Sequence, residues 1–202
     1  MILIGYSGHA FVVFGILKNA GTLVTGYCDN EEKPYNPFAL DYLGRESDLS
    51  SIEKIKKSGY FVSVGDNSIR KKIHLQLVEK TNRQPVNAIH LNAVIDATVM
   101  ISESGVMVAA NVVINALAKI GMGVICNTGC IIEHECSVGD FAHIGPGAVL
   151  CGNTSIGEQT FVGAGAVIRQ GIIVGKNVII GAGAVVVKNV PDNKTVIGCP
   201  AK

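Results

Sequence analysis

A six-residue repeat of hydrophobic positions runs through the second half of the chain. Fourteen hexads follow one another from Gly105 to Lys188, and the fourth position of each is Val, Ile or Leu, except for Cys126. The second position is apolar or small in every hexad. Alternate side chains of a β-strand share one face, so positions two and four should point together into an interior. A hexapeptide period predicts a parallel β-helix.

The repeat also predicts how the coils stack. Three hexads would make one eighteen-residue coil, with successive coils ~4.8 Å apart, so residues eighteen apart should lie above one another. The fifth position is often glycine, and we expect these glycines to form the tight corners. Ile95 and Ile101 lie one residue out of phase, which predicts an imperfect first coil.

Before the repeats, short hydrophobic runs alternate with helical patterns. The predicted strands are 1–4, 23–28, 60–64 and 86–89. A first helix is predicted to follow the loop at 5–10 and to end near Lys18, and two more are predicted at 48–58 and 68–81. Residues 30–45 are a predicted loop. This alternation is typical of a small parallel-sheet α/β domain with right-handed crossovers. We therefore predict a Rossmann-like α/β domain at 1–91 and a β-helix at 92–202.

The ends of the predicted strands carry candidate ligand-binding residues, because ligands of such sheets bind beyond the carboxyl ends of the strands. Ser7, Gly8 and His9 follow the first strand at a helix start, where backbone N–H groups can hold a phosphate. Asp29 follows about twenty residues later, a spacing typical of groups that bind a ribose hydroxyl. The full glycine fingerprint is missing, so a glycine-rich turn without a ligand is the alternative interpretation.

Composition narrows the function classes. The net charge of +1 gives no electrostatic reason to expect nucleic acid or an anionic membrane as partner. No apolar run is long enough for a signal peptide or a membrane span, so a cytoplasmic protein is expected. Cys126, Cys130 and Cys136 occupy inward positions of the repeat and should be buried free thiols. Their spacing matches no common zinc site, which leaves a metal or a disulfide as the less favoured alternative.

Two histidines fall within the repeats. His134 occupies a sixth position, an outward corner, and is followed by Glu135. Gly152 lies eighteen residues further on, so it should stack one coil away on the same edge. The alternative interpretation of this cluster is a solvated polar corner without a catalytic role. His143 is nine residues, or one and a half faces, from His134, so a shared site would require a neighbouring subunit.

Three segments resemble one family. They are Gly-Tyr-Ser-Gly-His-Ala at 5–10, Val-Gly-Asp-Asn-Ser-Ile-Arg at 64–70, and Asn-Thr-Gly-Cys-Ile-Ile-Glu-His-Glu-Cys at 127–136. Together with the tail Gly-Cys-Pro-Ala-Lys, they are similar to the bacterial nucleotide-amino-sugar acetyltransferases, a family that includes sialic acid O-acetyltransferases. The resemblance extends over nearly the whole chain. It implies a left-handed β-helix, a homotrimer with sites between subunits, and acetyl-CoA as co-substrate.

The resemblance also implies residue roles. The α/β domain would bind the UDP part of the sugar substrate through Ser7, Gly8 and His9 near phosphate, Asp29 and Asn30 near the nucleoside, and Gly65 close by. Acetyl-CoA would contact His143 and the backbone at Ala164 and Ala182. Many relatives carry an acidic pair where this chain has Asp29 and Asn30, so the nucleoside preference stays open.

Acyl transfer from a thioester to an amine needs a proton acceptor, and histidine suits this near neutral pH. We assign His134 as general base, Glu135 as its modulator, and the Gly152 N–H as donor to the tetrahedral oxyanion. Cys136 is expected to be buried and is rejected as a nucleophile. No metal is expected.

The predicted function is acetyl-CoA-dependent N-acetylation of a UDP-linked 4-amino-6-deoxy sugar by direct attack of the amine. The main alternative is O-acetylation of sialic acid or a related sugar. A hexapeptide-repeat carbonic anhydrase would need three zinc-binding histidines, and the repeats contain only His134 and His143. A sugar-nucleotide-binding scaffold without turnover is the non-enzymatic alternative.

Overall fold

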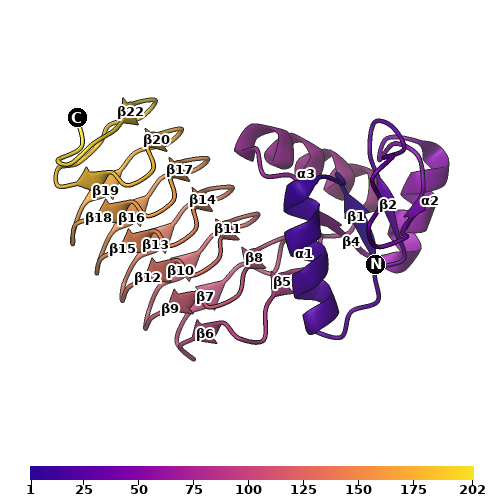
Figure 1. The fold of residues 1–202 in the computed structure, drawn as a ribbon, viewed down its shortest axis with the longest axis horizontal. Coiled ribbons are helices and arrows are strands. Elements are labelled where there is room, and N and C mark those ends of the chain that lie inside the picture. The colour runs from indigo at the N-terminus through magenta and orange to yellow at the C-terminus, as the bar shows by residue number, and fades with distance from the viewer.

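The computed structural model describes residues 1–202, which form an α/β domain at one end of a long β-helix (Figure 1). The domain contains a parallel sheet with strand order β3-β2-β1-β4. Its elements are β1 (Ile2–Ile4), α1 (Gly8–Asn19), β2 (Gly26–Cys28), β3 (Asp41–Tyr42), α2 (Leu49–Ser58), β4 (Tyr60–Val62) and α3 (Asn67–Thr81). The prediction of a loop throughout 30–45 is wrong at β3, because a two-residue edge strand has no hydrophobic pattern to mark it.

The β-helix is left-handed and has three sheets of two-residue parallel strands, here called faces 1, 2 and 3. Face 1 contains β5 (Ala88–Ile89), β8 (Met107–Val108), β11 (Ile125–Cys126), β14 (His143–Ile144), β17 (Phe161–Val162), β20 (Ile179–Ile180) and β22 (Thr195–Val196). Face 2 contains β6 (Val94–Ile95), β9 (Val113–Ile114), β12 (Ile131–Ile132), β15 (Val149–Leu150), β18 (Val167–Ile168) and β21 (Val185–Val186). Face 3 contains β7 (Met100–Ile101), β10 (Lys119–Ile120), β13 (Ser137–Val138), β16 (Ser155–Ile156) and β19 (Ile173–Val174).

The register confirms the eighteen-residue coil: His143 pairs with Ile125 on one side and Phe161 on the other. The first coil is one residue longer, since Ile95 pairs with Ile114 and Ile101 with Ile120. This confirms the imperfect coil expected from their phase.

The predicted fourth strand, 86–89, does not join the α/β sheet. β5 pairs with β8 instead and forms the first rung of face 1. The prediction was wrong because a short apolar run does not reveal which sheet will accept it. The hydrogen bonding of the β-helix thus begins at Ala88, inside the segment assigned to the first domain.

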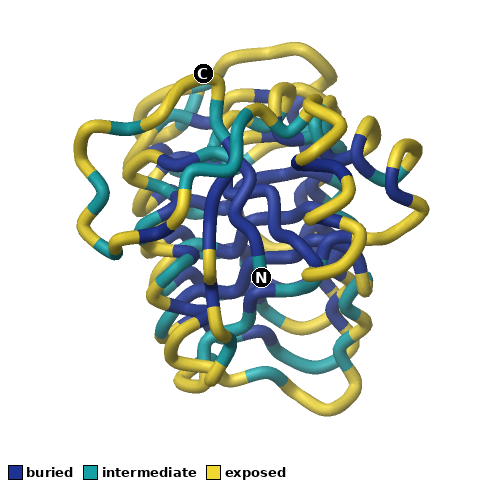
Figure 2. Tube along the Cα trace, turned by 90° about the vertical axis from the view of Figure 1, so that its right-hand side faces the viewer, coloured by how far each residue is buried: buried dark blue, intermediate teal, exposed yellow.

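The interior of the β-helix is formed as the repeat predicts. All second and fourth positions of the fourteen hexads are buried. Figure 2, seen from the end that carries the α/β domain, shows buried stretches toward the middle of the molecule and exposed ones at its periphery. Cys126, Cys130 and Cys136 are buried and free. Burial raises the pKa of the Cys136 thiol, which makes it a poor nucleophile.

The corners differ from the prediction. The residues with left-handed backbone are the first positions of all fourteen hexads, not the fifth: Gly105, Asn111, Leu117, Gly123, Gly129, Glu135, Phe141, Gly147, Asn153, Gln159, Gly165, Gly171, Asn177 and Gly183. The fifth-position glycines serve close stacking instead. A Cβ at Gly157, for example, would lie 2.4 Å from the backbone of Gly175 in the next coil.

The α/β domain packs against the β-helix through α1, which lies on β5 of face 1, and through α3, which contacts the corner between faces 3 and 1. The buried His74 ring lies edge-on to Phe141, with centroids 5.1 Å apart, and Lys71 forms an ion pair with Glu158. Outward side chains of face 1 are therefore covered near the domain and uncovered further along the coils. None of the helices combines the length and apolar character that crossing a membrane requires.

Candidate active site

His134 and Glu135 form an exposed pair at the corner between faces 2 and 3. The Nδ1 atom of His134 lies 3.0 Å from Oε2 of Glu135, and about half of each side chain is exposed. Glu135 occupies a first position and has left-handed backbone, with φ of 61°. A carboxylate on Nδ1 fixes the tautomer that leaves Nε2 unprotonated and able to accept a proton.

Gly152 lies one coil from His134 on the same edge, as the spacing predicts. The two corners are linked by the N–H of Asn153, which donates to the carbonyl of His134 at 2.9 Å. A Cβ on Gly152 would lie 2.6 Å from Nε2 of His134, so only glycine leaves room for the ring. The N–H of Gly152 donates to no backbone carbonyl and stays available for another acceptor.

Away from His134, a cavity of about 330 Å³ lies at the carboxyl ends of β1, β2 and β4. It brings together the predicted residues Ser7, Asp29, Asn30 and Gly65. We call it the nucleotide cavity, after the ligand that the sequence leads us to expect there. Its position agrees with the rule that ligands of parallel sheets bind beyond the strand ends.

The start of α1 leaves donors free at this cavity. Ser7 is the N-cap residue, but its hydroxyl makes no capping hydrogen bond, and the first turn contains no acidic side chain. Gly8 faces open space. The unpaired N–H groups of the first turn and the helix dipole together favour an anion here.

Asp29 is already engaged within the chain. Its carboxylate accepts from the N–H of Tyr6 at 2.8 Å and of Asn30 at 2.7 Å, and it pairs with Lys33 at 3.2 Å. These contacts hold the loops of β1 and β2 together. The carboxylate therefore shapes the nucleotide cavity besides lining it.

His9 lies away from the nucleotide cavity, although Ser7, two residues before it, lines the cavity. Its ring lies near Gly65 on the β-helix side, 6.2 Å from the His143 ring between centroids. Burial and the Arg70 guanidinium lower the pKa of His9 to about 4. His9 is therefore neutral at neutral pH and brings no positive charge to a phosphate.

His143 points out of the β-helix interior, but the α/β domain covers it and it is only 8% exposed. The Asn127 amide lies 3.1 Å from its Nε2, whereas its buried Nδ1 has no partner. Burial, Arg70 and His9 lower the pKa of His143 to about 3, so the ring is neutral. The sequence did not reveal this burial because it depends on the docking of the α/β domain.

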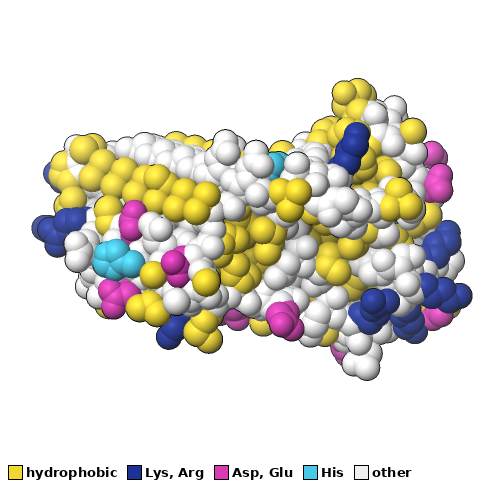
Figure 3. All heavy atoms as spheres, turned by 90° about the horizontal axis from the view of Figure 1, so that it is seen from below, with side chains coloured by type: hydrophobic (Ala, Val, Ile, Leu, Met, Phe, Trp, Pro, Cys, Tyr) yellow, Lys and Arg dark blue, Asp and Glu magenta, His cyan; other side chains and the backbone are white.

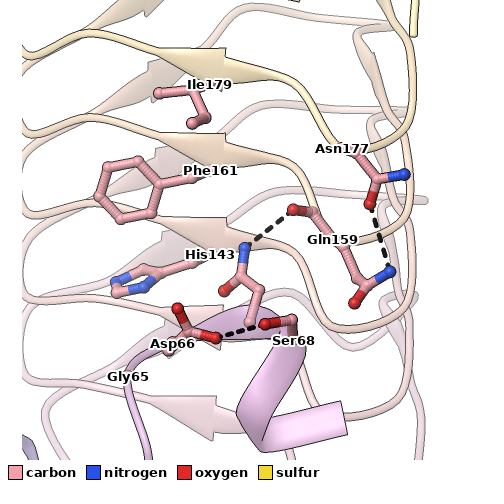
Figure 4. Close-up of a pocket in the computed structure, with 9 residues that line it drawn as sticks. Gly65, Asp66, Ser68, His143, Gln159, Phe161, Asn177 and Ile179 are labelled. Carbon is pink, nitrogen blue, oxygen red and sulfur yellow. Dashed lines mark hydrogen bonds between the residues drawn. The ribbon is translucent and has the colours of Figure 1, made fainter. Parts of the chain in front are cut away.

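His143 lines the largest cavity, of about 540 Å³, between the start of α3 and face 1 (Figure 4). We call it the groove. Its lining also includes Asp66 and Asn67, which follow the predicted strand 60–64 at a candidate ligand-binding end. Sequence reasoning missed the other lining residues, which are Ser68, Gln159, Phe161, Asn177 and Ile179. The eighteen-residue spacing of the third positions His143, Phe161 and Ile179 was the available signal. Gly65 lines both the groove and the nucleotide cavity.

Comparison with known proteins decides the family. Residues 1–77 match the PglD N-terminal domain, and residues 153–188 match the bacterial transferase hexapeptide model of six repeats. A perosamine N-acetyltransferase from Caulobacter crescentus, solved with CoA and GDP-perosamine, is 36% identical, with a TM-score of 0.92 over 100% of this chain and 94% of that one. This chain belongs to the nucleotide-amino-sugar acetyltransferase family.

Other members of the acetyltransferase family have the same fold. The acetyltransferase domain of PglB from Neisseria gonorrhoeae, solved with acetyl coenzyme A, is 33% identical, with a TM-score of 0.92 over 100% of this chain and 97% of that one. WeeI from Acinetobacter baumannii is 28% identical, with a TM-score of 0.85 and the same coverage. The resemblance noted from the sequence motifs is thereby confirmed, and the chain is an acyltransferase.

Within one copy of this acetyltransferase, the predicted site residues fall on two edges of the β-helix. His134, Glu135 and Gly152 lie at the corner between faces 2 and 3. Ala164 and Ala182 are exposed at the corner between faces 1 and 2, and neither lines the groove. The structure does not bring these two sets together in one chain.

Proposed function

We propose that this protein transfers the acetyl group of acetyl-CoA to the amine of a nucleotide-linked 4-amino-6-deoxy sugar. The observation that carries the proposal is the His134 ring, fixed by Glu135 through Nδ1 and lying against Gly152. The likeness to the perosamine enzyme, solved with CoA and GDP-perosamine, supports the substrate class.

The reaction needs no covalent enzyme intermediate. The sugar nitrogen attacks the thioester carbonyl carbon while Nε2 of His134 takes a proton from the amine. The N–H of Gly152 donates to the oxyanion of the tetrahedral intermediate. The C–S bond then breaks, the amide forms, and the proton passes to the leaving thiolate to give CoA. Glu135 stabilises the imidazolium in between.

The nucleotide part of the substrate fits the nucleotide cavity. Its diphosphate would lie against Ser7 and Gly8 at the start of α1, and its nucleoside beside Asp29 and Asn30. UDP is the nucleotide expected from the sequence. GDP is the second candidate, because a relative of 36% identity was solved with GDP-perosamine.

The acetyl-CoA arm fits the groove. His143, Phe161 and Ile179 lie above one another on face 1, about 4.8 Å apart per rung. The extended, largely apolar pantetheine would run along this row, with the small residues Ala164 and Ala182 at its edge. Neutral His143 would donate or accept a hydrogen bond without a charge.

A homotrimer would complete the site. Face 2 lies between the two edges, and its outward third positions are all aliphatic: Val94, Val113, Ile131, Val149, Val167 and Val185. Figure 3 shows hydrophobic side chains in a row along this side of the β-helix. A ring of copies packed through face 2 would set the His134 edge of one copy against the Ala182 edge of the next.

A substrate panel tests the proposal. UDP- and GDP-linked 4-amino-6-deoxy sugars and free sialic acid are each assayed with acetyl-CoA for thiol release, and the product is identified by mass spectrometry. We expect N-acetylation of at least one nucleotide amino sugar. Turnover of sialic acid alone would overturn the proposal in favour of the O-acetyltransferase alternative.

A further inference from the structure

The segment Val64–Arg70 contains the end of the loop after β4 and the first residues of α3, and it lies between the two cavities. Of its residues, Gly65 and Asp66 line both cavities, and Asn67 and Ser68 line the groove. Arg70 and Asn67 take no part in the reaction as described, yet both side chains cross the domain boundary. Their contacts show a more specific role than packing.

Arg70 is buried without an acidic partner. Its side chain is 1% exposed and is in no ion pair. On the β-helix side, Nε donates to the carbonyl of Gly123 at 2.9 Å and Nη2 to that of Phe141 at 2.8 Å. Stripping a buried cation of such acceptors is costly, so these carbonyls hold the guanidinium in place.

Asn67 extends the same contact by one coil. Its amide donates to the carbonyl of Gln159 at 3.0 Å, and its Oδ1 accepts from Arg70 at 2.9 Å. Gly123, Phe141 and Gln159 are the first positions of three successive coils, all with left-handed backbone. The start of α3 therefore binds a column of three stacked carbonyls.

On the other side, Arg70 holds the loop after β4. Its Nη1 donates to the carbonyls of Gly65 at 2.9 Å and Val64 at 3.2 Å. Gly65 lines the nucleotide cavity and the groove. The Arg70 guanidinium thus joins the Gly65 loop, which lies between the two cavities, to the β-helix coils that carry His143.

We propose that Arg70, assisted by Asn67, is a positioning residue that fixes the Gly65 loop against the β-helix and so sets the offset between the bound nucleotide sugar and the thioester. This rests on the proposed function. Lysine cannot replace arginine here, because a single ammonium cannot reach carbonyls on both sides of the boundary. A small shift of a bound reactant can lower the rate ~100-fold.

The test compares Arg70→Lys and Asn67→Ala with the control Lys71→Met, which removes the neighbouring ion pair to Glu158 but leaves the loop contacts. The measurements are kcat and KM for the accepted sugar, and the Kd of the matching nucleoside diphosphate by calorimetry. We expect kcat to fall about 10- to 100-fold in Arg70→Lys, and less in Asn67→Ala, with the diphosphate Kd within about two-fold. Lys71→Met should keep kcat within about two-fold of the wild type.

Two results would overturn the inference. One is an unchanged kcat in the folded variants. The other is a loss confined to diphosphate affinity, which would make Arg70 part of the nucleotide cavity alone. If Arg70→Lys does not fold, Asn67→Ala decides in the same way. If the wild type acetylates no nucleotide amino sugar, the proposed function has failed, and amide hydrogen exchange still tests the loop: residues 64–68 must exchange faster in Asn67→Ala than in Lys71→Met, and equal rates would reject the role.

Discussion

The imidazole of His134 lies against Gly152 so closely that a Cβ at Gly152 would be 2.6 Å from both Cε1 and Nε2. The backbone of Gly152 is not left-handed, so alanine suits its conformation. The glycine is therefore required by the histidine and not by the fold. A substitution of Gly152 should therefore affect catalysis without affecting stability.

Gly152→Ala should displace the His134 ring without unfolding the protein. We expect kcat to fall about 100-fold, the magnitude typical of a misplaced general base, with little change in the melting temperature. Gln170→Ala, one coil further along the same edge, is the matched control and should keep its activity. Full activity of Gly152→Ala would show that the ring position seen here is not the reactive one.

Glu135→Gly should lose activity but not stability. Glu135 has φ of 61°, a conformation that costs an L-residue ~1 kcal/mol and costs glycine almost nothing. Thermal unfolding should therefore show a melting temperature equal to or above that of the wild type, while kcat falls about ten-fold or more because His134 loses its partner.

Glu133→Gln is the control for this experiment. Glu133 flanks His134 on the other side but accepts from Asn115 at 2.9 Å instead. Its removal should leave kcat nearly unchanged. Equal losses in Glu133→Gln and Glu135→Gly would mean that general negative charge, and not the 3.0 Å contact, supports the histidine.

The repeat predicted the interior of the β-helix well because burial of positions two and four follows from the pleat alone. It also placed Gly152 beside His134 through the eighteen-residue coil. The corners were misassigned because glycine has two uses, positive φ at first positions and close stacking at fifth positions, and composition does not separate them. Asn111 and Phe141, which share the left-handed backbone of the first-position glycines, show which use belongs to which position.

Site residues could be placed from the sequence only where the predicted strands and repeats fix their positions. Ser7, Asp29 and Gly65 converge because parallel strands end at one edge. His9 and His143 could not be placed, since their burial arises from docking of the α/β domain on the β-helix. The hydrogen bonds from Arg70 to Gly123 and Phe141, which fix that docking, span more than fifty residues and leave no periodic trace.

Mixed trimers test whether the site is shared between copies. His134→Ala and Ala182→Trp damage different edges, so each variant alone should be nearly inactive. Random mixing of the two should restore about a quarter of wild-type activity, because one junction in four joins an intact His134 edge to an intact groove. Activity no higher than the sum of the separate variants would place the whole site in one chain.

Acid should weaken the docking of the α/β domain. Burial is the main cause that lowers the pKa of His143 to about 3 and of His9 and His74 to about 4, from an ordinary value of 6.5. Below pH 6.5 these histidines bind protons in the unfolded chain but not in the native state. The contribution of the three histidines to stability is therefore full above pH 6.5 and falls as the pH drops toward 4.

The melting temperature should therefore decline between pH 6.5 and 5, where ordinary carboxylates are still ionised. His74→Gln can keep a hydrogen bond to Ser104, which lies 2.9 Å from Nε2 of His74, and should flatten part of this decline. A melting temperature that stays constant over this range in the wild type would contradict the neutral, buried state of the three histidines.

The most direct measurement is the rate of acetyl transfer by His134→Ala with the nucleotide amino sugar that the wild type accepts, on a preparation whose oligomeric state matches the wild type. With His134 as the general base, kcat should fall ~100- to 10,000-fold while the affinities for acetyl-CoA and nucleotide stay within a few-fold. Undiminished transfer by the intact assembly would contradict the assignment of His134 as the base.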